Sequence, residues 1–233
     1  MAWCSHLLRR FYQPAVFVSP FFERPSPAVQ GAAIMATTKT VTVQIDPADL
    51  KRLRNLNYCM CFAKKVSNDF NVVWHSCTDY LATSRFIWIS AYRMFATSKF
   101  TAGDRVSIQT ELVDVGLGEM LTLDPVGDLK GPAVSSGDPG GITLSNAFGL
   151  IHPGLAIGPD GQTTPVYVAK DPIAKGTDTT LYPTEIVRVW FAQNAVTGTM
   201  IGEAPSYFVD IDMTATDTAT RLYKDAMWTT TAT

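Results

Sequence analysis

The stretch TVTVQIDPADLKRLRNL, residues 40–56, sets the structural pattern of the chain. Apolar and polar residues alternate over residues 40–45, and this period of two predicts a strand with one buried face. Asp46 is suited to cap a helix and Pro47 fits a first helical position, so a short helix is expected directly after the strand. Later segments show no comparable helical pattern.

Beyond residue 56, short runs rich in β-branched and aromatic residues are separated by Asn, Asp and Gly, which favour turns. This spacing predicts an all-β fold: an antiparallel β-sandwich or flattened barrel of about ten short strands with one short N-terminal helix. The stretches 125–141 and 149–162 are rich in Gly and Pro and are expected to be loops. The later strand segments are 58–66, 71–77, 85–96, 104–115, 119–124, 165–169, 185–193, 206–214 and 221–229.

Residues 1–34 differ from the rest of the chain because they contain four prolines and show no usable period. We interpret them as an irregular leader or an upstream extension, with residues 35–233 as a single β-sandwich domain. Their arginines and near-absence of acidic residues leave a mitochondrial transit segment as an alternative. No clear secretory signal or transmembrane segment is present. The localisation stays open, with the cytoplasm slightly favoured.

The composition narrows the classes of partner. The net charge is −2 and only 17% of residues are charged. Basic residues are dispersed, so nucleic-acid binding is not expected, since it needs a concentrated basic face. A weakly charged surface favours coverage by a partner or by copies of the same chain. A membrane partner is not favoured.

Three of the four cysteines and one histidine lie within YCMCFAKKVSNDFNVVWHSC, residues 58–77. If a three-residue turn joins the two strands, Cys59, Cys61, His75 and Cys77 share one face of a hairpin. Such a set would suit tetrahedral zinc. A Cys61–Cys77 disulfide is a second alternative. A one-residue shift of register would place His75 and Cys77 on the face opposite to that of Cys59 and Cys61. We favour a third interpretation, in which the cysteines simply fill the core.

Two other groups are candidates for ligand binding. His152 and Asp160 lie in the expected loop region 125–164, although His152 is more readily explained by a bond to a backbone carbonyl. Tyr223 and Trp228 belong to a set of aromatic residues spread over the strands, and those that emerge at loop ends would suit stacking on sugar rings.

No catalytic motif is present, so an enzyme is not expected and no cofactor is implied. We expect a non-enzymatic β-sandwich binding protein, lectin-like or directed at another cell-surface ligand, with a carbohydrate as its partner. The alternative is a self-assembling structural protein that forms oligomers or filaments. A third hypothesis, a membrane-active β-sandwich toxin, would need an N-terminal amphipathic helix, which Pro14 interrupts.

Overall fold

The computed structural model describes residues 37–134, 138–157 and 163–230. Met35–Thr233 form one compact unit, distinct from Met1–Ile34. The expected irregular leader, residues 1–34, lies outside the described residues, and its character stays a prediction.

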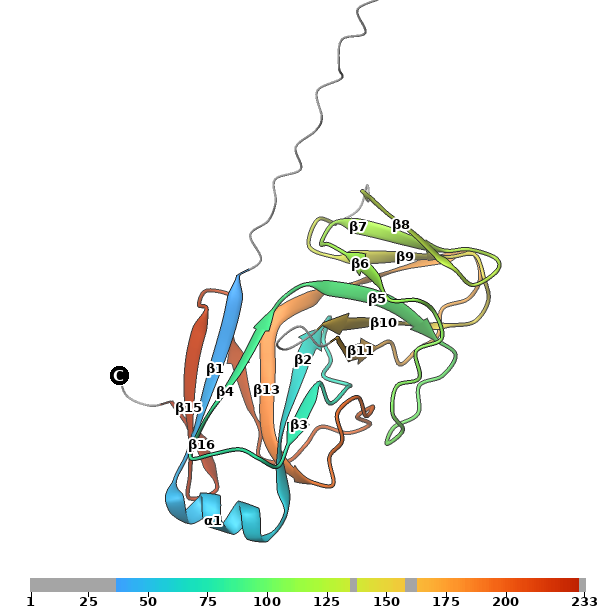
Figure 1. Cartoon of the computed structure of the whole chain (residues 1–233). Helices are drawn as coiled ribbons and strands as arrows, with labels where there is room; N and C mark the ends of the chain where they lie inside the picture. The colour runs from blue at the N-terminus through green and yellow to red at the C-terminus, as the bar shows by residue number, and fades with distance from the viewer. Residues whose placement is uncertain (1–36, 135–137, 158–162, 231–233) are drawn as a thin grey trace, which may run out of the picture. The chain divides into compact units, whose positions relative to one another are not determined.

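The described residues form an all-β fold with one short helix, α1 (Pro47–Asn55), as the sequence predicts (Figure 1). They contain sixteen strands, rather than about ten, arranged in four sheets of four strands each. The strands are β1 (Thr38–Ile45), β2 (Tyr58–Val66), β3 (His75–Cys77), β4 (Thr83–Ile89), β5 (Tyr92–Thr97), β6 (Val113–Val115), β7 (Glu119–Leu123), β8 (Leu129–Val134), β9 (Ile142–Asn146), β10 (His152–Ile157), β11 (Thr164–Val168), β12 (Thr177–Leu181), β13 (Pro183–Gln193), β14 (Val209–Asp212), β15 (Thr218–Lys224) and β16 (Met227–Thr229).

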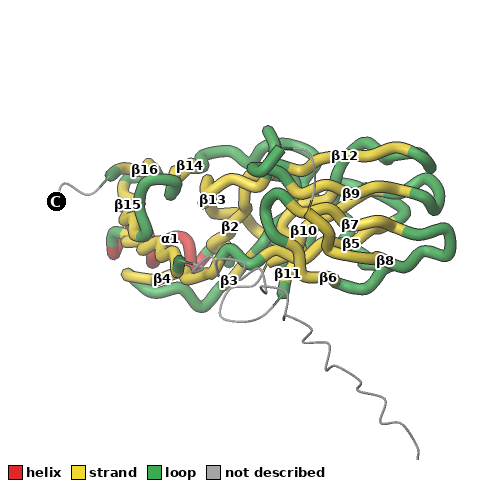
Figure 2. The backbone as a smooth tube through the Cα atoms, turned by 90° about the horizontal axis from the view of Figure 1, so that it is seen from above, coloured by secondary structure: helices red, strands yellow, loops and turns green. Residues whose placement is uncertain are grey.

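The first sheet has the strand order β16-β15-β1-β4, and the second has the order β14-β13-β2-β3. The third sheet is β11-β10-β5-β6 and the fourth is β12-β9-β7-β8. Figure 2 shows β15, β16 and α1 at one end of this unit, and β7, β8, β9 and β12 toward the other.

Most strand pairs of the described residues are antiparallel, as the sequence predicts, and two pairs are parallel. β1 pairs with β15 in parallel, and β7 pairs with β9 in parallel. A parallel pair cannot be joined by a tight turn, so its partners are separated by intervening chain. The first of these pairs brings the C-terminal part of the chain next to the N-terminal strand.

Local sequence explains the first two elements. The alternation in β1 buries Val41, Val43 and Ile45 on one face. The Asp46 side chain accepts a hydrogen bond from the backbone N–H of Ala48 (3.0 Å), as expected for a helix cap.

Both stretches predicted as Gly/Pro loops contain strands. β8 lies within 125–141, and β10 lies within 149–162 and is buried along its whole length. β10 is central in its sheet, between β5 and β11, so tertiary packing there overrides the local preference for turns. Gly154 in β10 has a packing reason, because a Cβ at this position would lie 2.3 Å from the Phe95 ring.

The segment 85–96, expected as one strand, breaks at Ser90 and Ala91. β4 on one side of the break belongs to the first sheet, and β5 on the other belongs to the third. The break therefore lets one run of chain pass from sheet to sheet.

A buried ion pair lies beside this break. Lys64 Nζ of β2 is 3.0 Å from Glu185 Oε2 of β13, with the Lys64 side chain 0% exposed and the Glu185 side chain 24% exposed. The other oxygen, Glu185 Oε1, accepts hydrogen bonds from Ser90 Oγ (2.8 Å) and Tyr92 OH (3.4 Å). Burial lowers the pKa of the Lys64 ammonium, and the charge of Glu185 opposes that shift.

The ion pair yields a stability prediction. Glu185→Ala leaves the Lys64 ammonium buried without its carboxylate, and should lower the free energy of unfolding by about 3 to 5 kcal/mol in urea titrations. Glu203→Ala, which removes an exposed carboxylate, should change it by less than about 0.5 kcal/mol.

The Glu185→Ala variant should also change how the free energy of unfolding depends on pH. Since the folded state lowers the pKa of Lys64 below its ordinary 10.5, the unfolded state binds more protons at alkaline pH. The contribution of Lys64 to the free energy of unfolding therefore rises with pH toward 10.5. Because Glu185 opposes the lowering of the Lys64 pKa, its removal should make this rise begin at lower pH. A Glu185→Ala variant with an unchanged unfolding midpoint at every pH would contradict this role of the pair.

Candidate functional site

The cysteine hairpin does not have the register that a zinc site requires. Cys77 lies opposite Met60, and His75 lies opposite Phe62. Because neighbouring positions on a strand face opposite ways, Cys77 and His75 share the face of Met60 and Phe62, away from that of Cys61. The predicted pairing of Cys61 with Cys77 is therefore wrong by one residue.

The turn explains this error. A bridge between Val66 and Asp69 closes a turn of two residues, and Ser67 takes a left-handed conformation with φ of 53°. The chain then leaves the ladder, where the N–H of Val73 donates to Thr199 O (2.8 Å), and rejoins β2 at His75. The assumed three-residue turn missed this excursion.

The cysteines pack as core residues. Cys59 and Cys61 are buried in a cluster with Ala63, Phe70 and Trp190, while Cys77 packs against the main core. All three are free thiols, so the disulfide alternative is also wrong. Residues 37–134, 138–157 and 163–230 contain no group of three or more His, Cys, Asp or Glu that could hold a metal ion.

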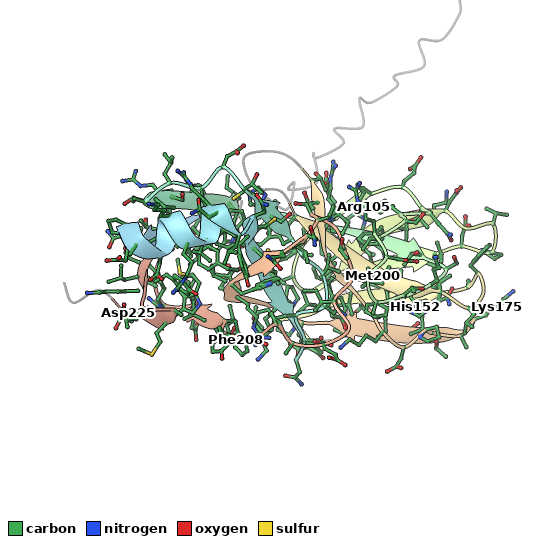
Figure 3. All side chains as sticks on the ribbon, turned by 90° about the horizontal axis from the view of Figure 1, so that it is seen from below. Arg105, His152, Lys175, Met200, Phe208 and Asp225 are labelled. Atoms are coloured by element: carbon green, nitrogen blue, oxygen red, sulfur yellow. The ribbon has the colours of Figure 1, made fainter. Side chains whose placement is uncertain are left out.

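His152 does not lie in a loop. It is the first residue of the buried strand β10, and its Nδ1 lies 2.8 Å from the carbonyl oxygen of Ala169. This bond to a backbone carbonyl agrees with the simpler of the two sequence interpretations. Asp160, its proposed neighbour, falls outside the described residues. Figure 3 shows His152 far from α1 and Asp225, so His152 does not share a site with Tyr223 and Trp228 of the β15–β16 hairpin.

Tyr223 and Trp228, by contrast, belong to an aromatic cluster with Phe191. The Phe191 and Trp228 rings are nearly parallel, with an interplanar angle of 3° and centroids 5.5 Å apart. Tyr223 meets both rings edge-on, with centroid distances of 4.8 and 4.9 Å. Such offset and edge contacts are the arrangements that aromatic rings prefer.

This cluster borders a pocket of about 550 Å³, here called the α1 pocket. Helix α1, strand β13, the β15–β16 hairpin and the loop before β14 all contribute to its walls. Its main side chains are those of Arg52, Leu56, Tyr58, Phe191, Tyr207 and Tyr223. Trp228 supports the pocket from the side, because its Nε1–H donates to the carbonyl oxygen of Tyr207 (2.9 Å).

Arg52 is the one charged side chain among the described residues that line the α1 pocket. Its guanidinium forms an ion pair with Asp49, one turn earlier on α1, whose carboxylate is buried. Burial raises the pKa of the Tyr223 phenol and the charge of Asp49 adds to this, whereas the charge and hydrogen bond of Arg52 lower it. Arg52 therefore links the helix to the aromatic wall.

Left-handed backbone conformations gather around the same pocket. Tyr207 (φ 54°) and Ala226 (φ 61°) line it, and Asn57 (φ 53°) and Asp225 (φ 52°) adjoin lining residues. Asn and Asp tolerate this conformation, but it is strained for Tyr and Ala. Asp225 and Ala226 form the two-residue turn of the β15–β16 hairpin, which favours positive φ at both positions, and Asn57 follows the C-cap of α1. Tyr207 is the remaining residue of this group, and it lies in a loop.

Sequence reasoning missed Arg52, Phe191 and Tyr207 as members of one site. Arg52 is separated from Phe191 and Tyr207 by more than a hundred residues along the chain, and nothing in the segment around Tyr207 marks it as a ligand contact. The aromatic content alone pointed to Tyr223 and Trp228.

Comparison of the chain with protein-family models, curated proteins and solved structures found no match. In the described part of the chain, no helix has the length and apolarity needed to cross a membrane. The function is therefore inferred from the chemistry of the pocket.

Burial of the cysteines predicts low thiol reactivity. Burial raises the pKa of Cys77 from 9.0 to about 11, with the charges of Cys59 and Asp79 adding to the shift. A shift of this size leaves about a hundredfold less thiolate at pH 8, so native Cys77 should react with iodoacetamide about a hundredfold more slowly than in urea. Peptide mass mapping after timed alkylation measures this, and equal rates in both states would contradict it.

Proposed function

We propose that the protein is a non-enzymatic binding module that holds a carbohydrate in the α1 pocket. The observation that carries this proposal is Tyr207, an aromatic residue that is 80% exposed. It lines the same pocket as the rings of Phe191 and Tyr58. Aromatic faces of this kind stack on the apolar C–H face of a sugar ring.

The polar groups of the pocket complement this aromatic surface. Arg52 carries five N–H donors, of which the ion pair with Asp49 occupies only part. Tyr223 and Tyr58 add phenolic hydroxyl groups among the lining residues. Donors placed beside aromatic faces match the alternation of hydroxyl groups and apolar surface on a sugar. A volume near 550 Å³ also falls within the usual range for small-ligand sites.

The same chemistry supports binding rather than catalysis. Hydrolysis of a glycosidic bond requires two carboxyl groups that flank the bond. The carboxylate of Asp49, which pairs with the lining residue Arg52, is buried. The described lining residues contribute no carboxylate of their own.

Glycan-array binding followed by titration tests the proposal. Tyr207→Ala should weaken binding of the best glycan about tenfold, because one stacking face is lost. Its melting temperature should stay close to that of the parent, since the ring is mostly exposed. Tyr182→Ala is the matched control: Tyr182 is also an exposed tyrosine, but it does not line the pocket.

An array that shows no glycan binding would reject the carbohydrate ligand. Equal loss of affinity in Tyr207→Ala and Tyr182→Ala would reject the α1 pocket as the place where the glycan binds.

Self-assembly is a second candidate, and the position of β4 favours it. β4 is the last strand of the first sheet, so its outer edge pairs with no other strand of that sheet. Arg85 is the one charged residue in this seven-residue strand, and Ile87 and Ile89 are exposed. An apolar edge with few charges is a template for pairing with another chain.

Light scattering over a wide concentration range distinguishes the two candidates. If β4 mediates assembly, the mass should climb with protein concentration, and Ile87→Lys should abolish the climb because a lysine on an edge strand opposes pairing. A constant small mass for both proteins would exclude assembly through β4.

A further inference from the structure

A second cavity, of about 170 Å³, lies away from the α1 pocket and shares no lining residue with it. It opens between β5, β7 and the turns that follow β7 and β9. We call it the β7 cavity. Its inner wall consists of three buried apolar residues, Ala96, Leu123 and Ile151, and of buried Thr97. The interior is therefore largely apolar, with the Thr97 hydroxyl as a buried polar group that has no hydrogen-bond partner among the described residues.

The polar side chains at the rim of the cavity already form some of the hydrogen bonds that they can make. Thr110 Oγ1 accepts a hydrogen bond from the N–H of Ala96 (2.9 Å) and donates one to Glu111 O (3.0 Å). Gln109 Nε2 donates to Ser98 Oγ (2.8 Å), which leaves the amide oxygen of Gln109 as an acceptor. None of the described lining residues is charged. A charged ligand would lose its hydration without an ionic partner, so the cavity suits an uncharged one.

Two exposed apolar side chains stand at the mouth of the cavity. Val126 is 78% exposed and Phe148 is 47% exposed. Exposed apolar groups that border a cavity mark a surface that a ligand can cover.

Hydrogen bonds hold both of these mouth residues in position. The N–H of Val126 donates to Asp124 Oδ1 (2.9 Å), and the N–H of Phe148 donates to Asn146 Oδ1 (3.0 Å). Asn146 is itself buried, and its amide also donates to Gly149 O (2.6 Å) and Ile173 O (3.2 Å). A mouth fixed in this way needs little reordering when a ligand enters.

The volume limits the ligand to a small ring. Apolar cavities of about 150 Å³ in other proteins accept benzene. We propose that the β7 cavity binds a small uncharged monocyclic aromatic compound, such as an alkylphenol, with its ring against Phe148 and Leu123 and its hydroxyl group directed to Gln109. This site is independent of the carbohydrate site proposed above.

Titration of the full chain with p-cresol, followed by protein NMR, tests the proposal. Saturable shifts are expected for residues of β5, β7 and the Phe148 turn, with a dissociation constant below about 1 mM. The anionic analogue 4-hydroxybenzoate should bind at least about tenfold more weakly, because no cation lines the cavity.

Two pairs of variants locate the binding. Phe148→Ser should weaken p-cresol binding about fivefold or more, since it removes a wall of the cavity. Leu150→Ser, two residues further on, removes a side chain that is 66% exposed but does not line the cavity, and should leave the affinity within about twofold. Ala96→Leu should abolish binding by filling the interior, whereas Ala195→Leu, which lies outside the cavity, should not.

Three results would overturn the proposal: no saturable shift with p-cresol, equal affinity for the anionic analogue, or equal losses in Phe148→Ser and Leu150→Ser. If Ala96→Leu does not fold, as judged by its thermal unfolding, the comparison of Phe148→Ser with Leu150→Ser decides the question by itself.

Discussion

The Lys64–Glu185 ion pair is the polar contact that connects the second sheet to the break between β4 and β5. The pair joins β2 to β13 in the second sheet, and the second oxygen of Glu185 holds Ser90 and Tyr92 at the break between β4 and β5. The Lys64 ammonium also lies over the rings of Trp88 and Tyr92, with centroid distances of 5.8 and 5.9 Å. One charge pair therefore fixes the point at which the chain passes from the first sheet to the third. Its desolvation is tolerable because each group has several partners.

The α1 pocket follows from a second constraint, the parallel pairing of β1 with β15. This pairing places Ile45 opposite Tyr223, and the N–H of Asp46 donates to Tyr223 O (3.0 Å). The residue that caps α1 is thus tied to the hairpin that carries the aromatic cluster. The helix supplies Arg52, the hairpin supplies Tyr223, and β13 supplies Phe191 between them. None of these groups would meet if β15 paired elsewhere.

Sequence reasoning succeeded where local chemistry decides the outcome. The alternation in β1, the cap at Asp46 and the burial of Cys59 and Cys61 all follow from short-range patterns. It failed at β10, where Gly and Pro favoured a loop but neighbouring strands on both sides impose extended structure. Of the predicted ligand residues, Tyr223 lines the α1 pocket and Trp228 packs against it, and their role in binding stays a prediction.

The sequence by itself determined the all-β class, the single short helix within the described residues and the core role of the cysteine hairpin. These depend on periodicity and side-chain size, which act over a few residues. Only the tertiary structure decided the hairpin register, the parallel pairs and the joining of Arg52, Phe191 and Tyr207 in one pocket. These depend on which distant strands become neighbours. Which strands become neighbours depends on packing interactions over the whole chain, so no short stretch of the sequence reveals it.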